Sequence, residues 1–258
     1  MSSLQGKTIL ITRAREQASD FRRLLEQAGA RVKEIPVIEI RPRAAPELDQ
    51  AIARLDDYDW LIFTSTNGAD LFFQRSLSLR PQASGLRPRI CAIGPATAEK
   101  IRQYGRDVEL MPALFQAEGV IEELSKLYQG NLRAVRILIP RAGRAREILP
   151  EELRTRGAEV DVIPVYDTVV PPKSRQALRQ ALDHDAPDLI TFTSSSTVRH
   201  FAELANGRSD LPHFAYAAIG PITAATAREY GLTIVCQPKH STIPEFARTI
   251  ERYFQSQT

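Results

Sequence analysis

Two short loops rich in hydroxyl groups are the first stretches of this sequence that could take part in chemistry. Each follows an apolar run typical of a buried parallel strand and precedes an amphipathic helix. Side-chain oxygens at such a place can cap the helix or, at the carboxyl end of a strand, contact a ligand. The residues are Thr64, Ser65, Thr66 and Asn67 in the first loop, and Ser194, Ser195 and Ser196 in the second.

Two arginines occupy matching positions in the two halves of the chain. Arg13 and Arg141 each follow a β-rich run and precede a helix. The helix macrodipole disfavours a cation there by several tenths of a kcal/mol, and a bound polyanion would remove that cost. A single arginine can equally extend into solvent. Recurrence in both halves favours an anion site.

A tyrosine and two Gly-Pro turns complete the candidate residues. Tyr166 lies in an extended segment whose counterpart in the first half has Ile38. Its phenol, with an ordinary pKa of about 10, can donate a proton or bind a leaving oxygen, and packing against a strand edge is the alternative. The turns place Gly94, Thr97 and Thr223 at predicted helix starts.

Composition and missing motifs exclude several classes of function. The 258 residues have a net charge of +3, which gives no argument for nucleic acid or membrane as a partner. Gly-rich phosphate loops and the serine-hydrolase elbow are absent from the sequence. The four histidines are scattered, so we expect no metal, and Cys91 and Cys236 read as buried thiols of a reducing compartment. The N-terminus has no apolar core of a secretory signal, which predicts a cytoplasmic protein.

The two halves of the chain repeat the same pattern of strands and helices. Phe63-Thr64-Ser65 and Phe192-Thr193-Ser194 are 129 residues apart, which is half of the length. Strand, helix and strand patterns match in order over nearly the whole chain, which predicts two open parallel α/β units. Helices are expected near 18–28, 46–55 and 174–182, and short strands near 107–110 and 232–235.

Domain organisation has two solutions at this point. A sequential arrangement would place a boundary near Gly130-Asn131. Alternatively, the long extended stretches around Pro36 and Pro164 could carry the chain from one domain into the other, since a proline in mid-strand cannot donate to a central ladder. Periodicity alone does not choose between them.

The motifs, taken together and in order, resemble those of uroporphyrinogen-III synthase. They are Thr12-Arg13 and Pro140-Arg141, the two Phe-Thr-Ser loops, the two Ile-Gly-Pro-x-Thr turns and Ile163-Pro-Val-Tyr-Asp-Thr168. The resemblance implies two similar flavodoxin-like domains joined by a two-stranded linker, with the chain crossing twice. The implied domains are 1–37 plus 168–258 and 42–163, with linker strands 36–41 and 163–168.

The resemblance also implies a cofactor-free lyase reaction. Hydroxymethylbilane, a linear tetrapyrrole with eight carboxylates, is closed with inversion of ring D and loss of water to give uroporphyrinogen III. Tyr166 would assist departure of the hydroxyl, while the arginines, hydroxyls and turn residues named above, Asn67 and Gly94 included, would bind substrate in a cleft. We expect a monomer. The alternatives are a non-catalytic two-domain binding protein for an anionic metabolite and, less well matched, fused receiver-like domains, whose acidic pocket is replaced by Thr12-Arg13.

Overall fold

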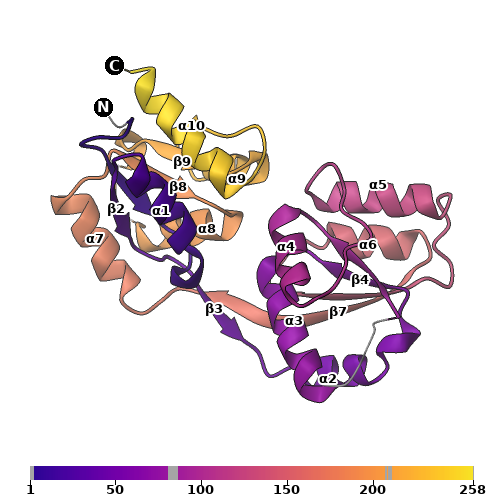
Figure 1. Ribbon diagram of the computed structural model, residues 1–258. Helices are drawn as coiled ribbons and strands as arrows, with labels where there is room; N and C mark the ends of the chain where they lie inside the picture. The colour runs from indigo at the N-terminus through magenta and orange to yellow at the C-terminus, as the bar shows by residue number, and fades with distance from the viewer. Residues whose placement is uncertain (1–2, 81–86, 207, 209–210, 258) are drawn as a thin grey trace. The chain divides into compact units, whose positions relative to one another are not determined.

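The computed structural model describes residues 3–80, 87–206, 208 and 211–257, and its contacts divide the chain into two compact units. The first unit comprises Met1–Glu39 and Val169–Thr258, and the second comprises Ile40–Thr168. Each unit is built around a five-stranded sheet (Figure 1). The chain therefore passes from one unit to the other twice, once near β3 and once at the end of β7.

The sheet of the first unit has the order β10-β9-β8-β1-β2, and each pair of neighbouring strands in it is parallel. Numbered in chain order within the unit, this is the 2-1-3-4-5 order of flavodoxin-like sheets. The strands are β1 (Thr8–Ile11), β2 (Arg31–Glu34), β8 (Leu189–Phe192), β9 (Tyr216–Ala218) and β10 (Ile234–Cys236).

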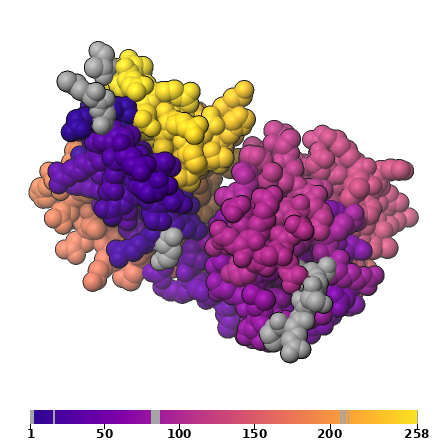
Figure 2. Space-filling view, in the orientation of Figure 1, coloured from indigo at the N-terminus to yellow at the C-terminus, as the bar shows by residue number. Residues whose placement is uncertain are grey.

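Helices from both ends of the chain cover this sheet. Phe21 of α1 stacks on Phe246 of α10, with ring centroids 5.1 Å apart, in a core that also holds Leu25 and Ile250. Indigo and yellow segments accordingly lie side by side in Figure 2. The helices are α1 (Ser19–Gln27), α7 (Ser174–His184), α8 (Ser195–Leu204), α9 (Pro221–Glu229) and α10 (Ile243–Gln255), with short 3-10 turns at Arg15–Gln17 and Leu211–His213.

The second unit repeats the arrangement in a permuted order. Its sheet is β3-β7-β6-β4-β5, in which β7-β6-β4-β5 matches the β2-β1-β8-β9 portion of the first sheet. The strands are β3 (Glu39–Pro42), β4 (Trp60–Phe63), β5 (Arg89–Ala92), β6 (Arg136–Ala142) and β7 (Glu159–Val169).

Alternating side chains of this sheet enter two separate cores, as expected for strands buried on both faces. Leu61 and Phe63 pack with α2, α3 and α4, whereas Trp60 and Ile62 pack with α5 and α6. The helices are α2 (Pro46–Ala53), α3 (Thr66–Leu79), α4 (Pro95–Gln103), α5 (Ala117–Leu127) and α6 (Ile148–Thr155), with a 3-10 turn at Leu55–Asp57.

The predicted fold class, two flavodoxin-like α/β domains with a chain that crosses twice, is confirmed. Gly29, which follows the end of α1, has φ 95°, and Gly157 after α6 has φ 97°. Both values lie in the left-handed region that favours glycine. No helix of the described residues is long and apolar enough to cross a bilayer.

The structure differs from the sequence prediction at the segment 107–110, which forms no regular strand. It contributes an isolated bridge between Leu110 and Cys91. The Glu109 carboxylate accepts a hydrogen bond from the Ile90 amide at 2.6 Å, so a side chain occupies a donor that a strand ladder would use. The extended linker segments also differ from each other, because β2 and β3 are separate strands around Pro36 whereas β7 continues through Pro164.

A partly buried hydrogen bond in the second unit predicts alkaline sensitivity. Tyr58 is 2% exposed and donates to Asp161 at 2.5 Å. Burial, followed by the Asp161 contact, raises the pKa of Tyr58 to about 12. The unfolded chain, with a tyrosine pKa of about 10, loses the proton first. The free energy of unfolding that Tyr58 contributes is therefore complete below about pH 10. It falls by about 1–2 kcal/mol as the pH rises towards 12, since solvent screens the half-exposed Asp161.

Denaturant unfolding at several pH values measures this effect. Tyr58→Phe should show a shallower loss of stability between about pH 10 and 12 than the parent protein. The same change at exposed Tyr230 is the control. Parallel curves for the parent and Tyr58→Phe would contradict the assignment.

Candidate functional site

The predicted site residues gather at the carboxyl edge of each sheet, beside the point where strand order reverses. In the first unit this point lies between β1 and β8, which pair from Ile9–Leu189 to Ile11–Thr191. In the second it lies between β6 and β4. Open α/β sheets bind ligands outside this switch point. Arg13 and the Ser194 loop follow the first pair of strands. In the second pair, the Ser65 loop follows β4, and Arg141 lies near the end of β6.

The loop after β4 is organised by Ser65. Its side-chain oxygen accepts the Gly68 amide at 3.0 Å and caps α3, which the sequence allowed for Ser65, Thr66 or Asn67. Thr64, Thr66 and Asn67 are partly buried beside it. The loop thus begins with a fixed helix N-terminus whose remaining amides favour negative charge.

Tyr166 lies on β7 and reaches this loop from a distant part of the sequence. Its hydroxyl oxygen is 3.0 Å from Ser65 Oγ, although the two residues are 101 positions apart. The residue is 5% exposed and belongs to the core with Phe63 and Leu138. Burial raises the pKa of Tyr166, and hydrogen bonds from the side chains of Ser65 and Asn67 oppose that rise. The phenol is therefore protonated at neutral pH and able to act as a donor.

A close approach of backbone brings these two residues together. A Cβ placed on Gly68 would lie 2.7 Å from the carbonyl oxygen of Pro140, in β6. Only glycine lets α3 come this near to the strand. Since Ala142 of β6 is the register partner of Tyr166, the same strand supports both the helix N-terminus and the tyrosine.

Arg141 already has two internal partners within the second unit. It is 7% exposed, donates to the Arg146 carbonyl at 2.9 Å, and forms an ion pair with Glu147. Its Nε has no partner. The guanidinium would have to exchange at least one internal contact before it could bind an external carboxylate.

Arg13 has the same position in the first unit but a different environment. Its hydrogen bond to the Gln17 side chain is 3.3 Å long, and its buried Nε has no partner. No ion pair to Arg13 is found among the described side chains. Burial lowers the pKa of Arg13 to about 10, while the charge of Asp20 opposes that shift. Arg13 is thus a desolvated cation with donors left over, which is the electrostatic requirement of an anion site.

The loop after β8 is held largely by its own hydroxyl groups. The Ser194 hydroxyl oxygen accepts a hydrogen bond from the Thr197 amide at 3.2 Å, and the Thr197 hydroxyl oxygen accepts one from the Ser194 amide. The two bonds form a capping box. Ser195 Oγ lies 2.9 Å from Thr226 Oγ1, and the Ser196 carbonyl contacts His200 at 2.9 Å. All three serines are partly buried, and each has an internal partner.

The Gly-Pro turns begin helices in both units. Gly94 is the N-cap of α4 and Gly220 that of α9, each with proline in the first turn. Thr97 and Thr223 are 5% and 6% exposed, so they lie inside the first turns of these helices. The structure therefore brings Ser65, Asn67 and Tyr166 into one network, while Gly94, Thr97 and Thr223 remain in separate turns.

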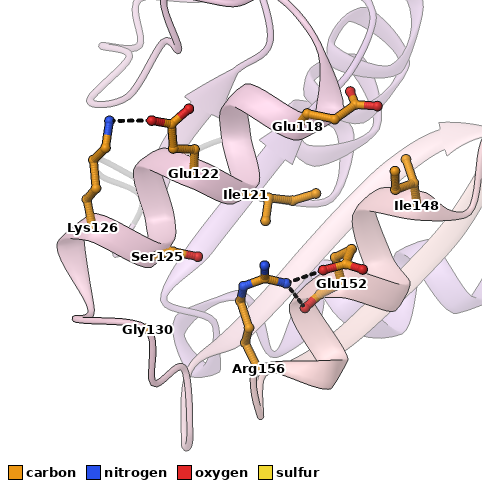
Figure 3. Close-up of a pocket in the computed structure, with 9 residues that line it drawn as sticks. All are labelled: Glu118, Ile121, Glu122, Ser125, Lys126, Gly130, Ile148, Glu152 and Arg156. Carbon is orange, nitrogen blue, oxygen red and sulfur yellow. Dashed lines mark hydrogen bonds and ion pairs between the residues drawn. The ribbon is translucent and has the colours of Figure 1, made fainter.

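A groove of about 590 Å³ lies elsewhere in the second unit, between α5 and α6 (Figure 3). Ile121 and Ile148 line it, and internal pairs of Lys126 with Glu122 and Arg156 with Glu152 border it. None of its lining residues is among the candidate residues above. The groove is separate from the switch-point edge.

Comparison with known proteins identifies the family. The model of the family described as uroporphyrinogen-III synthase HemD matches residues 19–247. The uroporphyrinogen-III synthase of Synechococcus elongatus is 33% identical over 263 positions, which cover 99% of this chain and 98% of that one. The chain belongs to the uroporphyrinogen-III synthase family. A Chlorobaculum parvum uroporphyrinogen-III synthase is 27% identical over 95% of this chain and 98% of its own.

Solved structures of uroporphyrinogen III synthases share the fold. A Thermus thermophilus mutant structure has a TM-score of 0.69 at 17% identity, covering 97% of this chain and 100% of that one. The Helicobacter pylori protein has a TM-score of 0.58 at 18% identity, covering 94% and 97%. The family, fold and lyase function predicted from sequence are thereby confirmed. The roles of individual side chains stay predictions.

Two contributors to the site were not predicted from sequence. Glu147 neutralises Arg141 from six residues downstream, and Gly68 permits the approach of α3 to β6. An acidic residue near a strand-end arginine was a visible signal in the first case. In the second case the only signal was a glycine in the first turn of a helix. Local sequence does not show that Pro140 of β6 lies next to it.

The contrast between the two arginines predicts opposite effects of the same substitution. Arg13→Met keeps the packing of the stem and removes a partly buried cation, so the free energy of unfolding should rise by about 1 kcal/mol. Arg141→Met removes two hydrogen bonds from a buried position and should lower it by about 1–2 kcal/mol. Denaturant unfolding without ligand measures both, each variant serving as the other's control. Equal losses would show that Arg13 is as well satisfied as Arg141.

Proposed function

We propose that this protein closes hydroxymethylbilane to uroporphyrinogen III, with inversion of ring D and loss of water. The observation that carries the proposal is the 33% identity to a uroporphyrinogen-III synthase over 99% of the chain. The carboxyl edges of the two sheets add chemical support, because they present a desolvated arginine, helix N-termini and a protonated phenol. A non-catalytic binding protein is not favoured, since family model and relatives agree on the synthase.

The chemistry asked of the side chains is limited. Loss of the terminal hydroxyl leaves a cation delocalised onto a pyrrole nitrogen, which is a property of the substrate. The protein has to hold the chain so that ring D attacks through its substituted carbon, a matter of orientation. Arg13, the first-turn amides of α3, α4, α8 and α9, and the nearby hydroxyls would bind the carboxylates. In this role we include Thr64, Ser65, Thr66, Asn67, Gly94, Thr97, Arg141, Ser194, Ser195, Ser196 and Thr223.

Tyr166 is the proposed proton donor to the departing hydroxyl. Its phenol is protonated at neutral pH because burial raises its pKa. Breaking the C–O bond while the Tyr166 proton moves to that oxygen releases water. Attack by the substituted carbon of ring D gives a spiro centre, whose older bond to the bridging carbon breaks and leaves a second cation on the neighbouring ring. The unsubstituted α-carbon of ring D then bonds to this cation and loses its hydrogen as a proton, which returns to the phenolate. Tyrosine is thus regenerated, and atoms balance without a cofactor.

The protein is further proposed to act as a monomer in the cytoplasm, with the linear tetrapyrrole as its partner and neither nucleic acid nor membrane. The free thiols of Cys91 and Cys236 are compatible with a reducing compartment. The net charge of +3 gives no general attraction to polyanions.

Product analysis tests the activity. Purified protein is incubated with hydroxymethylbilane, and the oxidised porphyrins are separated by isomer. The type III isomer should predominate, whereas closure without inversion gives type I. A product distribution equal to that of a protein-free incubation would overturn the proposal.

Tyr166→Phe tests the proton donor. The substitution keeps the ring in its core and loses the contact with Ser65, which still caps Gly68, so stability should fall by only about 1 kcal/mol. We expect kcat to fall about tenfold to a thousandfold with little change in KM. Arg13→Met is the contrast, with a raised KM and a smaller loss of kcat. Full turnover by Tyr166→Phe to the type III isomer would make Tyr166 a packing residue.

A further inference from the structure

The Ser65 hydroxyl connects two elements of the second unit. Its oxygen lies 3.0 Å from the Gly68 amide nitrogen at the start of α3 and 3.0 Å from the hydroxyl oxygen of Tyr166 on β7. A contact with the helix alone would be a cap, and a contact with the tyrosine alone would be a core hydrogen bond. The two together fix the phenol relative to the N-terminus of a helix.

One arrangement of protons satisfies every group in this network, and the distance between Ser65 and Tyr166 itself allows either hydroxyl to donate. The Gly68 amide can only donate, so it occupies one acceptor position of Ser65 Oγ. The serine proton remains available, and the phenol oxygen lies within its reach. Donation from the amide polarises the hydroxyl and strengthens the bond that it donates in turn. A chain running from Gly68 N–H through Ser65 O–H to the Tyr166 oxygen satisfies each group.

We propose that Ser65 is a positioning residue for Tyr166, whose phenol oxygen accepts the serine proton and whose own proton is thereby left free for the substrate's departing hydroxyl. This assignment rests on the proposed function. It gives Ser65 a contact with Tyr166 in place of the direct contact with substrate proposed above. When the Tyr166 proton is transferred, the phenolate is held by the Ser65 donor and faces the positive end of α3. The Asn67 side chain supplies a second hydrogen bond.

The first unit provides an internal comparison. Ser194 caps α8 as Ser65 caps α3, but its third helical residue is Thr197, which completes a reciprocal box. In the second unit that position is Gly68, whose missing side chain allows the approach to Pro140. The residue matching Tyr166 in the first unit is Ile38, which has no hydroxyl. The reciprocal box is therefore absent in the half of the chain where the cap faces a phenol.

Kinetics of serine variants test the proposal. Ser65→Ala should lower kcat about tenfold to a hundredfold and change KM by less than about threefold. Ser65→Thr, which keeps the hydroxyl, should restore most of the rate. Ser65→Gly removes the hydroxyl but keeps a residue tolerated at an N-cap, so it covers the case in which the alanine variant folds poorly. Thr242→Ala is the matched control, because it removes the cap of α10 and should keep the parent rate.

A double mutant distinguishes positioning from structure. If Ser65 acts through the phenol, adding Ser65→Ala to Tyr166→Phe should lower kcat no further. An equal reduction by Ser65→Ala in the parent and in Tyr166→Phe would overturn the proposal, as would an unchanged kcat of Ser65→Ala and Ser65→Gly.

A titration separates failure of this proposal from failure of the proposed function. The pKa of Tyr166 is followed by NMR of tyrosine labelled with carbon-13 at Cζ, with Tyr166→Phe assigning the signal. Loss of the Ser65 donor should raise that pKa further, because the phenolate loses a hydrogen bond. An unchanged pKa in Ser65→Ala would overturn the proposal. Absence of the type III isomer with the parent protein would overturn the proposed function and leave the titration result standing.

Discussion

Parallel pairing of neighbouring strands is the constraint on which both units depend. It places the carboxyl ends of the parallel strands at one edge, so loops that are distant in sequence begin side by side. In the second unit the order β7-β6-β4 puts the ends of three segments next to one another. Ser65, Arg141 and Tyr166 are neighbours of that edge for this reason. Gly68 then closes the remaining distance between α3 and β6.

Duplication gave two similar edges, and their electrostatics have since diverged. Arg141 is compensated by Glu147 and a carbonyl, whereas Arg13 has no ion pair among the described side chains and a pKa lowered to about 10 by burial. Conversely, the position that corresponds to Tyr166 in the first half of the chain is Ile38, which has no hydroxyl group. The edge of the first unit, with Arg13, is thus the stronger candidate for binding a carboxylate. The edge of the second unit, with Tyr166, is the stronger candidate for proton transfer. A buried cation costs stability in the free protein, which a bound carboxylate would recover.

Burial and hydrogen bonds from two neutral side chains, Ser65 and Asn67, shift the pKa of Tyr166, which suits a reaction in which the substrate stabilises its own cation. A phenol with a raised pKa keeps its proton until a specific acceptor is present. Hydrogen bonds from Ser65 and Asn67 lower the cost of the phenolate without ionising the residue beforehand. The fold therefore controls where the Tyr166 proton lies more than it controls the acid strength of the phenol.

The sequence by itself determined the repeated α/β pattern, the helix caps and the family, because hydrophobic periodicity, turn residues and ordered motifs are local properties. It also supplied both topologies without choosing between them. The tertiary structure decided which strands pair, and therefore which polar groups meet. Ser65 and Tyr166 are in contact although they lie 101 residues apart. The Ile90 amide donates to the Glu109 carboxylate and is therefore not available to the strand predicted at 107–110. Such outcomes depend on the distances between elements, which follow from packing across the sheet and leave no periodic signal in the chain.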